Sequence, residues 1–167
     1  MNIRPATDAD YDAIWNMVKP VIRGGRSYPL PRDLDREGSL VYWFAPDKDV
    51  FVAEQANTLV GVYYIKPTNQ GPGDHICNCG YVTNTAFRRQ GIGAKLCRHS
   101  LEYARQSGYR AMQYNLVVST NEGAMHLWKK MGFEIVGTLP MAFRDPDKGE
   151  VEAYVCDVSN ALGPTRQ

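Results

Sequence analysis

Two arginines and two glycines stand close together in the segment Thr83 to Ala94, TNTAFRRQGIGA, which leads from an expected strand into an expected helix. The first backbone N–H groups of a helix have no partner within it, and the peptide dipoles place partial positive charge at that end. Gly91 and Gly93 carry no Cβ, so the backbone here can approach an anion closely. Arg88 and Arg89 add formal charge. This pattern indicates a phosphate site, although an ordinary loop that starts a helix would use the same residue types.

The composition is that of a soluble globular protein. A chain of 167 residues with 44% hydrophobic and 22% charged residues fits one domain with a sheet-centred core. The formal net charge of +1 argues against a general nucleic-acid binder. No apolar run approaches the roughly 18 residues that span a bilayer, and the polar N-terminus lacks the apolar core of a signal peptide. We therefore expect a cytoplasmic protein with neither a nucleic-acid nor a membrane partner.

Four cysteines, Cys77, Cys79, Cys97 and Cys156, are too few for a dense disulfide framework. Cys97 also lies inside an expected amphipathic helix, so free thiols are predicted. The pattern His75-x-Cys77-x-Cys79 resembles a metal site faintly, but it lacks a fourth ligand and the usual ligand spacing. We expect no metal.

The apolar periodicity predicts a mixed sheet with helices on both of its faces. Thr7 or Asp8 is expected to cap a first helix, and Ser119 or Thr120 to cap the last one. The other expected helices cover 33–44 and the segment from the glycine turn to Gly108; the expected strands are 2–6, 50–54, 59–66, 75–83, 111–118, 133–136 and 150–158. The order βααβββαβαββ gives the class α/β (α+β). Residues 1–160 form one expected domain, followed by a frayed tail at 161–167.

The segment Arg23 to Pro31, RGGRSYPLP, is expected to break the chain between the first two helices. The aromatic cluster Tyr42-Trp43-Phe44 at the end of the second helix is interpreted as core packing. The alternative is that this region forms a lid and that its aromatic residues line a substrate pocket.

Two motifs stand at a defined separation and resemble the GNAT N-acetyltransferase superfamily. They are Arg88-x-x-Gly91-x-Gly93 after a strand, and TNEGAMHLWKKMGFEIVG at residues 120–137. The resemblance covers nearly the whole chain. It implies a mainly antiparallel sheet of about six or seven strands with about four helices. It also implies a V-shaped split between strands 75–83 and 111–118 that holds acetyl-CoA.

Carried over by position, the resemblance implies that the cofactor is bound by residues of the strand end, the glycine turn and the second motif. These are Tyr81, Val82, Thr83, Arg88, Arg89, Gln90, Gly91, Ile92, Gly93, Ala94, Asn121 and Trp128. One position departs from the family pattern, because Trp128 stands where the family commonly has a tyrosine that protonates the departing thiolate. An indole N–H donates a hydrogen bond but is far too weak an acid to replace a phenol.

A narrower resemblance covers residues 62–140 and is to the branch of fungal acetyltransferases that act on proline analogues such as azetidine-2-carboxylate. That branch also has tryptophan in place of the tyrosine. Its two functional asparagines match Asn78 and Asn115, which implies that these side chains serve the substrate and the reaction. Along an extended strand Asn78 lies about 16 Å from Thr83, and a kink at Gly80 is expected to shorten that path.

The predicted function is direct transfer of an acetyl group from acetyl-CoA to the amine of a small molecule, with an amino or imino acid favoured. Asp74, His75 and Glu54 are the candidate bases, and His75 has the most suitable intrinsic pKa, although a structural role for it is an alternative. Other acceptors are an antibiotic, a phosphinothricin-like compound or a peptide N-terminus. A CoA-binding sensor without activity is the rival class, and a homodimer is kept open.

We predict that Gly91→Glu weakens CoA binding, because it places bulk and negative charge where the pyrophosphate is expected. Titration calorimetry measures this directly. Binding as tight as that of the parent would show that the phosphate assignment is wrong.

Overall fold

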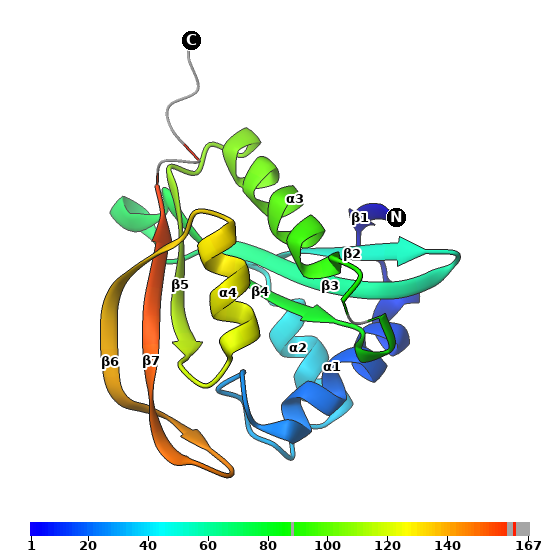
Figure 1. The fold of residues 1–167 in the computed structure, drawn as a ribbon. Helices are drawn as coiled ribbons and strands as arrows, with labels where there is room; N and C mark the ends of the chain where they lie inside the picture. Colours follow the sequence, from blue (N-terminus) through cyan, green and yellow to red (C-terminus); the bar gives the residue numbers. More distant parts are fainter. Residues whose placement is uncertain (88, 160–161, 163–167) are drawn as a thin grey trace.

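The computed structural model describes residues 1–87, 89–159 and 162, and within them one seven-stranded sheet is flanked by four α-helices (Figure 1). The strands are β1 (Asn2–Pro5), β2 (Asp49–Gln55), β3 (Thr58–Pro67), β4 (Ile76–Thr83), β5 (Ala111–Val118), β6 (Glu134–Asp145) and β7 (Gly149–Val158). The helices are α1 (Tyr11–Gly24), α2 (Arg36–Trp43), α3 (Ile92–Gln106) and α4 (Glu122–Lys130). The predicted order of elements and the mixed α/β class are confirmed.

The spatial order of the strands is β1-β2-β3-β4-β5-β7-β6, and neighbouring strands are antiparallel except for β4 and β5. The parallel pairing of β4 with β5 is limited to Ile76 with Ala111 and Cys77 with Met112. Beyond those two pairs the strands diverge, as Figure 1 shows. The expected V-shaped split is therefore present between these two strands.

Each face of the sheet has its own hydrophobic core. Buried residues of α3 and α4 pack with one face, and those of α1 and α2 pack with the other. Gly61 of β3 lets α3 approach closely, since a Cβ at this position would lie 2.8 Å from Cδ1 of Leu96. The split between β4 and β5 thus runs between two helical layers.

Several expected boundaries were wrong for identifiable reasons. Asn121 caps α4 in place of Ser119 or Thr120, because its Oδ1 accepts the Ala124 N–H at 3.2 Å. The second helix begins at Arg36, where the Asp35 side chain accepts the Gly38 N–H at 2.8 Å. Thr7 precedes a 3₁₀ turn, Asp8–Asp10, and the first α-helix begins only at Tyr11.

Strand β6 is much longer than the predicted segment 133–136. It lies at the edge of the sheet and its register against β7 shifts twice, between Ile135 and Gly137 and between Leu139 and Phe143. Met141 also has a positive φ of 51°. These irregularities break the alternation that identifies a strand in sequence.

The exposed side of β6 carries several large apolar side chains, namely Ile135, Val136, Leu139 and Met141. The homodimer kept open from the sequence stays a hypothesis.

Of the expected tail, Leu162 is buried in the α3 and α4 core, and 161 and 163–167 lie outside the described residues. In the described ranges no helix is long and apolar enough to cross a membrane.

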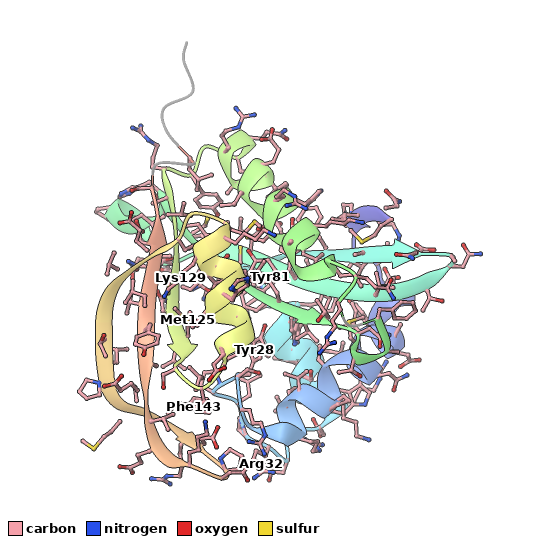
Figure 2. All side chains as sticks on the ribbon, in the orientation of Figure 1. Tyr28, Arg32, Tyr81, Met125, Lys129 and Phe143 are labelled. Atoms are coloured by element: carbon pink, nitrogen blue, oxygen red, sulfur yellow. The ribbon has the colours of Figure 1, made fainter. Side chains whose placement is uncertain are left out.

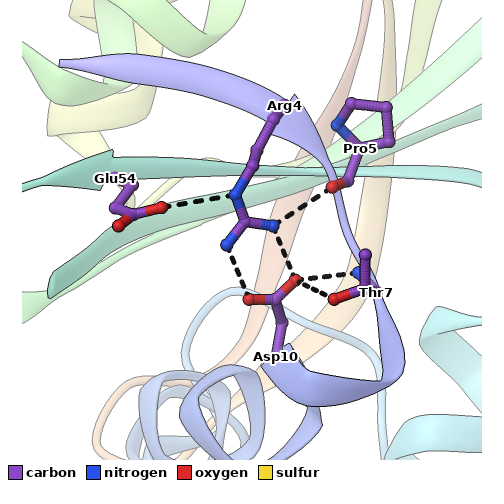
Figure 3. A network of polar contacts seen from close by, with 5 residues as sticks. All are labelled: Arg4, Pro5, Thr7, Asp10 and Glu54. Carbon is purple, nitrogen blue, oxygen red and sulfur yellow. Dashed lines mark hydrogen bonds and ion pairs between the residues drawn. The ribbon is translucent and has the colours of Figure 1, made fainter. Parts of the chain in front are cut away.

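An ion-pair network fastens the first strand to the start of the first helix (Figure 3). Arg4 donates to both carboxylate oxygens of Asp10 at 2.8 and 2.9 Å, and to Glu54 on β2 at 3.3 Å. Asp10 also accepts the backbone N–H of Thr7 at 2.8 Å. Chiefly because of the Arg4 hydrogen bond, the pKa of Asp10 falls from 3.8 to about 2.

We predict that Asp10→Asn lowers the free energy of unfolding by about 1–2 kcal/mol at neutral pH. The pKa of Asp10 is lower in the folded chain than in the unfolded one, so its contribution is complete above about pH 4 and is lost as the pH falls towards 2. Urea unfolding between pH 2 and 7 tests this. The matched control is Asp12→Asn, which removes an ion pair to Arg36 whose aspartate side chain is 81% exposed. Equal losses in the two variants would contradict the assignment.

Candidate active site

The facing edges of β4 and β5 carry backbone groups without a strand partner. Between β3 and β4, the N–H of Asn84 bonds to the Val60 carbonyl at 2.9 Å and the N–H of Thr68 to the Ile76 carbonyl at 2.7 Å. Antiparallel pairing alternates, so the N–H and C=O groups of Cys79, Tyr81 and Thr83 point away from β3 and into the split. The backbone groups of Val82 point towards β3 by the same rule.

A side chain closes the narrow end of the split. Nδ2 of Asn78 donates to the carbonyl oxygen of Gln113 at 2.8 Å, one residue beyond the last backbone pair between β4 and β5. Asn78 therefore continues the link between the strands at the point where the backbone ladder stops.

A cavity of about 300 Å³ occupies the split and is lined from both faces of the sheet. Its lining on the α1 and α2 side comprises Ser27, Tyr28, Pro29, Tyr42, Tyr64, Asn78, Gly80 and Asn115. The rest of the lining comprises Cys79, Tyr81, Tyr114, Leu116, Val117, Val118, Asn121, Ala124 and Trp128. None of these described lining residues carries a formal charge. The cavity thus connects the two helical layers through an uncharged passage.

Aromatic side chains form the wall on the α1 and α2 side. The hydroxyls of Tyr42 and Tyr64 bond to each other at 3.0 Å. The Tyr28 hydroxyl donates to the Tyr81 carbonyl oxygen at 3.1 Å. Figure 2 labels both residues. A Cβ on Gly80 would lie 2.5 Å from Cε1 of Tyr64 and 2.8 Å from the Tyr28 hydroxyl oxygen. Only glycine lets both phenols lie against the backbone of β4 here.

Lys48 lies behind this wall. Its ammonium is 3.5 Å from the ring centroid of Tyr42 and 4.5 Å from that of Tyr64, and it donates to the Tyr42 carbonyl. Burial, with a smaller contribution from Lys66, lowers the pKa of Lys48 to about 8. The lysine therefore supports the two rings from outside the cavity.

The opposite wall is a packed aromatic cluster. The ring of Trp128 lies 5.2 Å from Tyr81 and 4.7 Å from Tyr114, measured between centroids. The Tyr81 hydroxyl is bonded to Ser100 of α3 at 2.7 Å and to the Tyr114 hydroxyl at 2.9 Å. Burial raises the pKa of both tyrosines and of the Cys79 thiol well above their ordinary values. All three groups are therefore neutral near pH 7, and Cys79 is no thiolate nucleophile.

The glycine turn has the geometry of an anion site next to this cavity. Arg89 and Gly91 adopt the left-handed conformation, with φ of 63° and 71°, and α3 begins at Ile92. A Cβ on Gly93 would lie 3.1 Å from Cδ2 of Leu127, so the first turn of α3 packs closely against α4. Arg88 lies outside the described residues, whereas Arg89, Gln90 and Gly91 are exposed. The first N–H groups of α3, which have no partner within the helix, thus follow directly after exposed residues.

The structure brings together some of the predicted residues and leaves others apart. Asn78, Asn115, Tyr81, Asn121 and Trp128 all line the cavity. Asn115 is exposed and lies in the β5 register shift between Tyr114 and Val117.

The three candidate bases do not line the cavity. His75 is exposed and precedes β4 at the closed end of the split, where its carbonyl accepts the Arg110 N–H at 2.8 Å. Asp74 is exposed in the same loop. Glu54 lies on β2 and is paired with Arg4 of β1. A catalytic role for His75 stays a prediction that this geometry does not support. The expected kink at Gly80 was wrong, because the register of β4 on β3 is unbroken from Thr83 to Cys77.

A buried carboxylate joins the β6–β7 hairpin to two segments that continue into cavity residues, Ser27 and Asn121. Asp145, at the end of β6, accepts backbone N–H groups of Asp147 at 2.9 Å and Lys148 at 3.0 Å, and the Thr120 hydroxyl at 3.3 Å. Those backbone hydrogen bonds are the main reason that its pKa is lowered. Arg26 in the α1–α2 connection pairs with Asp147 at 2.5 Å and approaches Asp145 at 3.8 Å. These contacts therefore join three segments that are distant in sequence.

The sequence analysis missed Tyr28, Tyr64 and Tyr114 as cavity residues and assigned Tyr42 to packing. Tyr28 lies in a segment treated only as a chain break, and Tyr64 and Tyr114 lie within expected strands to which no site role was given. A lid was considered for the 42–44 cluster, and Tyr42 does line the cavity, whereas Trp43 is buried in the core. The tyrosines close to the two predicted asparagines in sequence, Tyr81 near Asn78 and Tyr114 next to Asn115, were the available signal for an aromatic cavity wall.

The four cysteines are buried and free, as predicted. Across the described ranges, no group of three or more His, Cys, Asp or Glu side chains is arranged to hold a metal ion.

Comparison with known proteins gives consistent matches. The model of the Acetyltransferase (GNAT) family matches residues 13–133. N-acetyltransferase aca1 of Schizosaccharomyces pombe is 29% identical over 80% of this chain and 72% of its own length. The structure of a GCN5-related N-acetyltransferase from Kribbella flavida superposes with a TM-score of 0.89 and 33% identity, covering 95% of this chain and 96% of that one.

A putative acetyltransferase from Salmonella typhimurium, solved with its cofactor acetyl-CoA, has a TM-score of 0.86 at 19% identity and covers 100% of this chain and 96% of its own. At that identity the likeness concerns the fold.

We predict that Gly80→Ala lowers the free energy of unfolding by about 1–3 kcal/mol, because the added Cβ overlaps the ring of Tyr64. Urea unfolding measures the loss. Gly24→Ala is the matched control, since a Cβ there meets no atom within 4 Å and no loss is expected. A Gly80→Ala variant as stable as the parent would show that the tyrosines do not depend on this glycine.

Proposed function

Because this chain belongs to the GNAT acetyltransferase family, we propose that it transfers the acetyl group of acetyl-CoA to the amine of a small molecule. Family membership confirms the acyltransferase class expected from the sequence and supports acetyl-CoA as the co-substrate. The observation that carries the proposal is the uncharged cavity through the split sheet, beside the exposed start of α3. The start of α3 suits a polyanion, and the uncharged cavity suits the reaction of a neutral amine.

The described residues suit the cofactor at two places. The backbone of Arg89 to Ala94 would hold the pyrophosphate through N–H groups at the start of α3, with the Arg89 side chain adding charge. The inward-facing backbone of Tyr81 and Thr83 would pair with the pantetheine arm. An N–H donor on this edge would also stabilise the oxyanion that develops on the thioester carbonyl, which is typically worth about 3 kcal/mol.

The acceptor would occupy the tyrosine-lined side of the cavity. Asn78 uses its Nδ2 to hold Gln113, and among the described residues its Oδ1 makes no hydrogen bond. That oxygen can accept a hydrogen bond from an amine, and the exposed Asn115 amide can donate to a carboxylate. This pair of functions suits a small amino or imino acid, and the narrower resemblance to proline-analogue acetyltransferases points to the same class.

An uncharged cavity also determines how the amine loses its proton. With no carboxylate or imidazole among the described lining residues, the acceptor would react after binding as the free amine. The proton that the ammonium form loses before the reaction would pass to water through the open end of the split. We therefore expect the rate at subsaturating acceptor to rise with pH up to the pKa of the acceptor itself.

Two alternatives remain distinct from this proposal. Another acceptor, such as an antibiotic, a phosphinothricin-like compound or a peptide N-terminus, would keep the chemistry and change the substrate. A CoA-binding sensor would keep the cofactor site and lack turnover. A cytoplasmic location is part of the proposal, and the four free thiols favour a reducing compartment.

The experiment that tests the function is an assay of CoA release from acetyl-CoA with a panel of amines. The panel should hold proline, azetidine-2-carboxylate, linear amino acids, a phosphinothricin, an aminoglycoside and short peptides. Turnover with a small amino or imino acid supports the proposal. Binding of CoA without thiol release for any amine would favour the sensor.

We predict that Asn115→Ala and Asn78→Ala each lower kcat/KM for the best acceptor at least tenfold and leave acetyl-CoA affinity nearly unchanged. Steady-state kinetics and calorimetry measure the two quantities. Asn115→Ala is the cleaner variant because Asn78 also links β4 to β5, so thermal unfolding of Asn78→Ala must be recorded as well. Asn16→Ala, at an exposed position on α1, is the control. If neither cavity variant loses tenfold, the amides do not orient the acceptor.

A further inference from the structure

The position from which a phenol would protonate the departing thiolate is filled here by Trp128, yet five tyrosines line the same cavity. Four of their hydroxyls are directed elsewhere. Tyr81 and Tyr114 are bonded to each other, and Tyr81 also to Ser100 beneath α3, while Tyr42 and Tyr64 are bonded to each other. The fifth hydroxyl belongs to Tyr28.

Tyr28 differs from the others in what its hydroxyl touches. Its partner at 3.1 Å is the carbonyl oxygen of Tyr81, which faces the split and has no partner on β5 in the described structure. Gly80 brings the phenol this close, because a Cβ would lie 2.8 Å from the hydroxyl oxygen. The ring lies 6.2 Å from that of Trp43, centroid to centroid. The hydroxyl is thus held at the edge of β4, inside the cavity.

The hydroxyl is also a replaceable donor. Its acceptor belongs to the strand edge along which an extended ligand would pair its own amides. A ligand N–H that bonds to the Tyr81 carbonyl would satisfy that oxygen and leave the Tyr28 proton free to turn towards the ligand. Burial of the phenol raises its pKa, so it carries its proton throughout the neutral range.

We propose that Tyr28, from the connection between α1 and α2, is the catalytic residue that donates its phenolic proton to the departing sulfur, in place of a residue on α4. This rests on the proposed acetyl transfer. The amine nitrogen forms the new N–C bond with its lone pair, and the C–S bond breaks with its electron pair on sulfur. Sulfur takes the proton of Tyr28, and the phenolate regains one proton from the acylated nitrogen. The sum is amine plus acetyl-CoA giving amide plus CoA thiol.

The first test measures binding and needs no acceptor. A phenol that contacts the sulfur stabilises bound CoA relative to desulfo-CoA, which lacks the thiol, and more so as the thiol ionises. Calorimetry at pH 7 to 9.5 should show that Tyr28→Phe weakens CoA at least threefold at the upper pH and leaves desulfo-CoA unchanged. Tyr103→Phe is the matched control, because it removes a phenol of α3 that donates to Asp49 of β2 at 2.9 Å and does not line the cavity. Equal changes for both ligands in Tyr28→Phe would overturn the proposal.

The second test is kinetic. With the acceptor found in the amine panel, Tyr28→Phe should lower kcat at least tenfold with little change in the KM for acetyl-CoA, whereas Tyr103→Phe should match the parent. An acetyl thioester whose leaving thiol is more acidic than that of CoA should recover part of the loss in kcat, which a structural defect would not allow. Full activity of Tyr28→Phe in an active parent overturns the Tyr28 assignment alone. A parent that turns over no amine refutes the proposed function instead.

Discussion

The structure depends on one constraint of the backbone: two adjacent strands stop pairing while each remains paired with its other neighbour. Buried N–H and C=O groups left without partners are costly, so such a split is stable only if water, side chains or a ligand satisfies them. Here the ladder between β4 and β5 ends after Cys77 and Met112, and a side-chain amide and a phenol satisfy one carbonyl each beyond it. The remaining groups form a template for an extended ligand with amides of its own.

This constraint separates the electrostatic tasks of the protein. Positive charge lies outside the sheet, at exposed Arg89 in the glycine turn and at the N-terminal end of the α3 dipole. Inside the sheet, the described cavity lining consists of neutral amides, phenols and apolar groups. Nothing in that lining repels a neutral amine, and hydrogen bonds there are stronger than in water because the surroundings are less polar.

The sequence was sufficient for the parts of the protein that depend on local pattern. The glycine turn and the order of the elements followed from short motifs and apolar periodicity, because local backbone conformation determines them. The split was expected only from the family resemblance. Tyr28 and Tyr42 could not be assigned in this way, because their position depends on how the α1–α2 connection folds over β4. The role of Asn78 as a link between strands was also hidden, since it depends on where the ladder ends. The long edge strand β6 was missed because two register shifts and Pro140 mask its alternation.

The buried carboxylate of Asp145 has a consequence for how this protein can diversify. It joins the β6–β7 hairpin and Thr120, which precedes α4, and through Arg26 it reaches the segment that carries Tyr28. The α1–α2 connection, which supplies Ser27, Tyr28 and Pro29 to the cavity lining, is thus held to the β6–β7 hairpin as well as to β4. Under the proposed function, exchanges in the α1–α2 connection would change the cavity wall next to the acceptor while the contacts of Arg26 with Asp145 and Asp147 keep the connection in place. Laboratory exchange of this connection would then be a route to a different acceptor preference that leaves the central strands of the sheet unchanged.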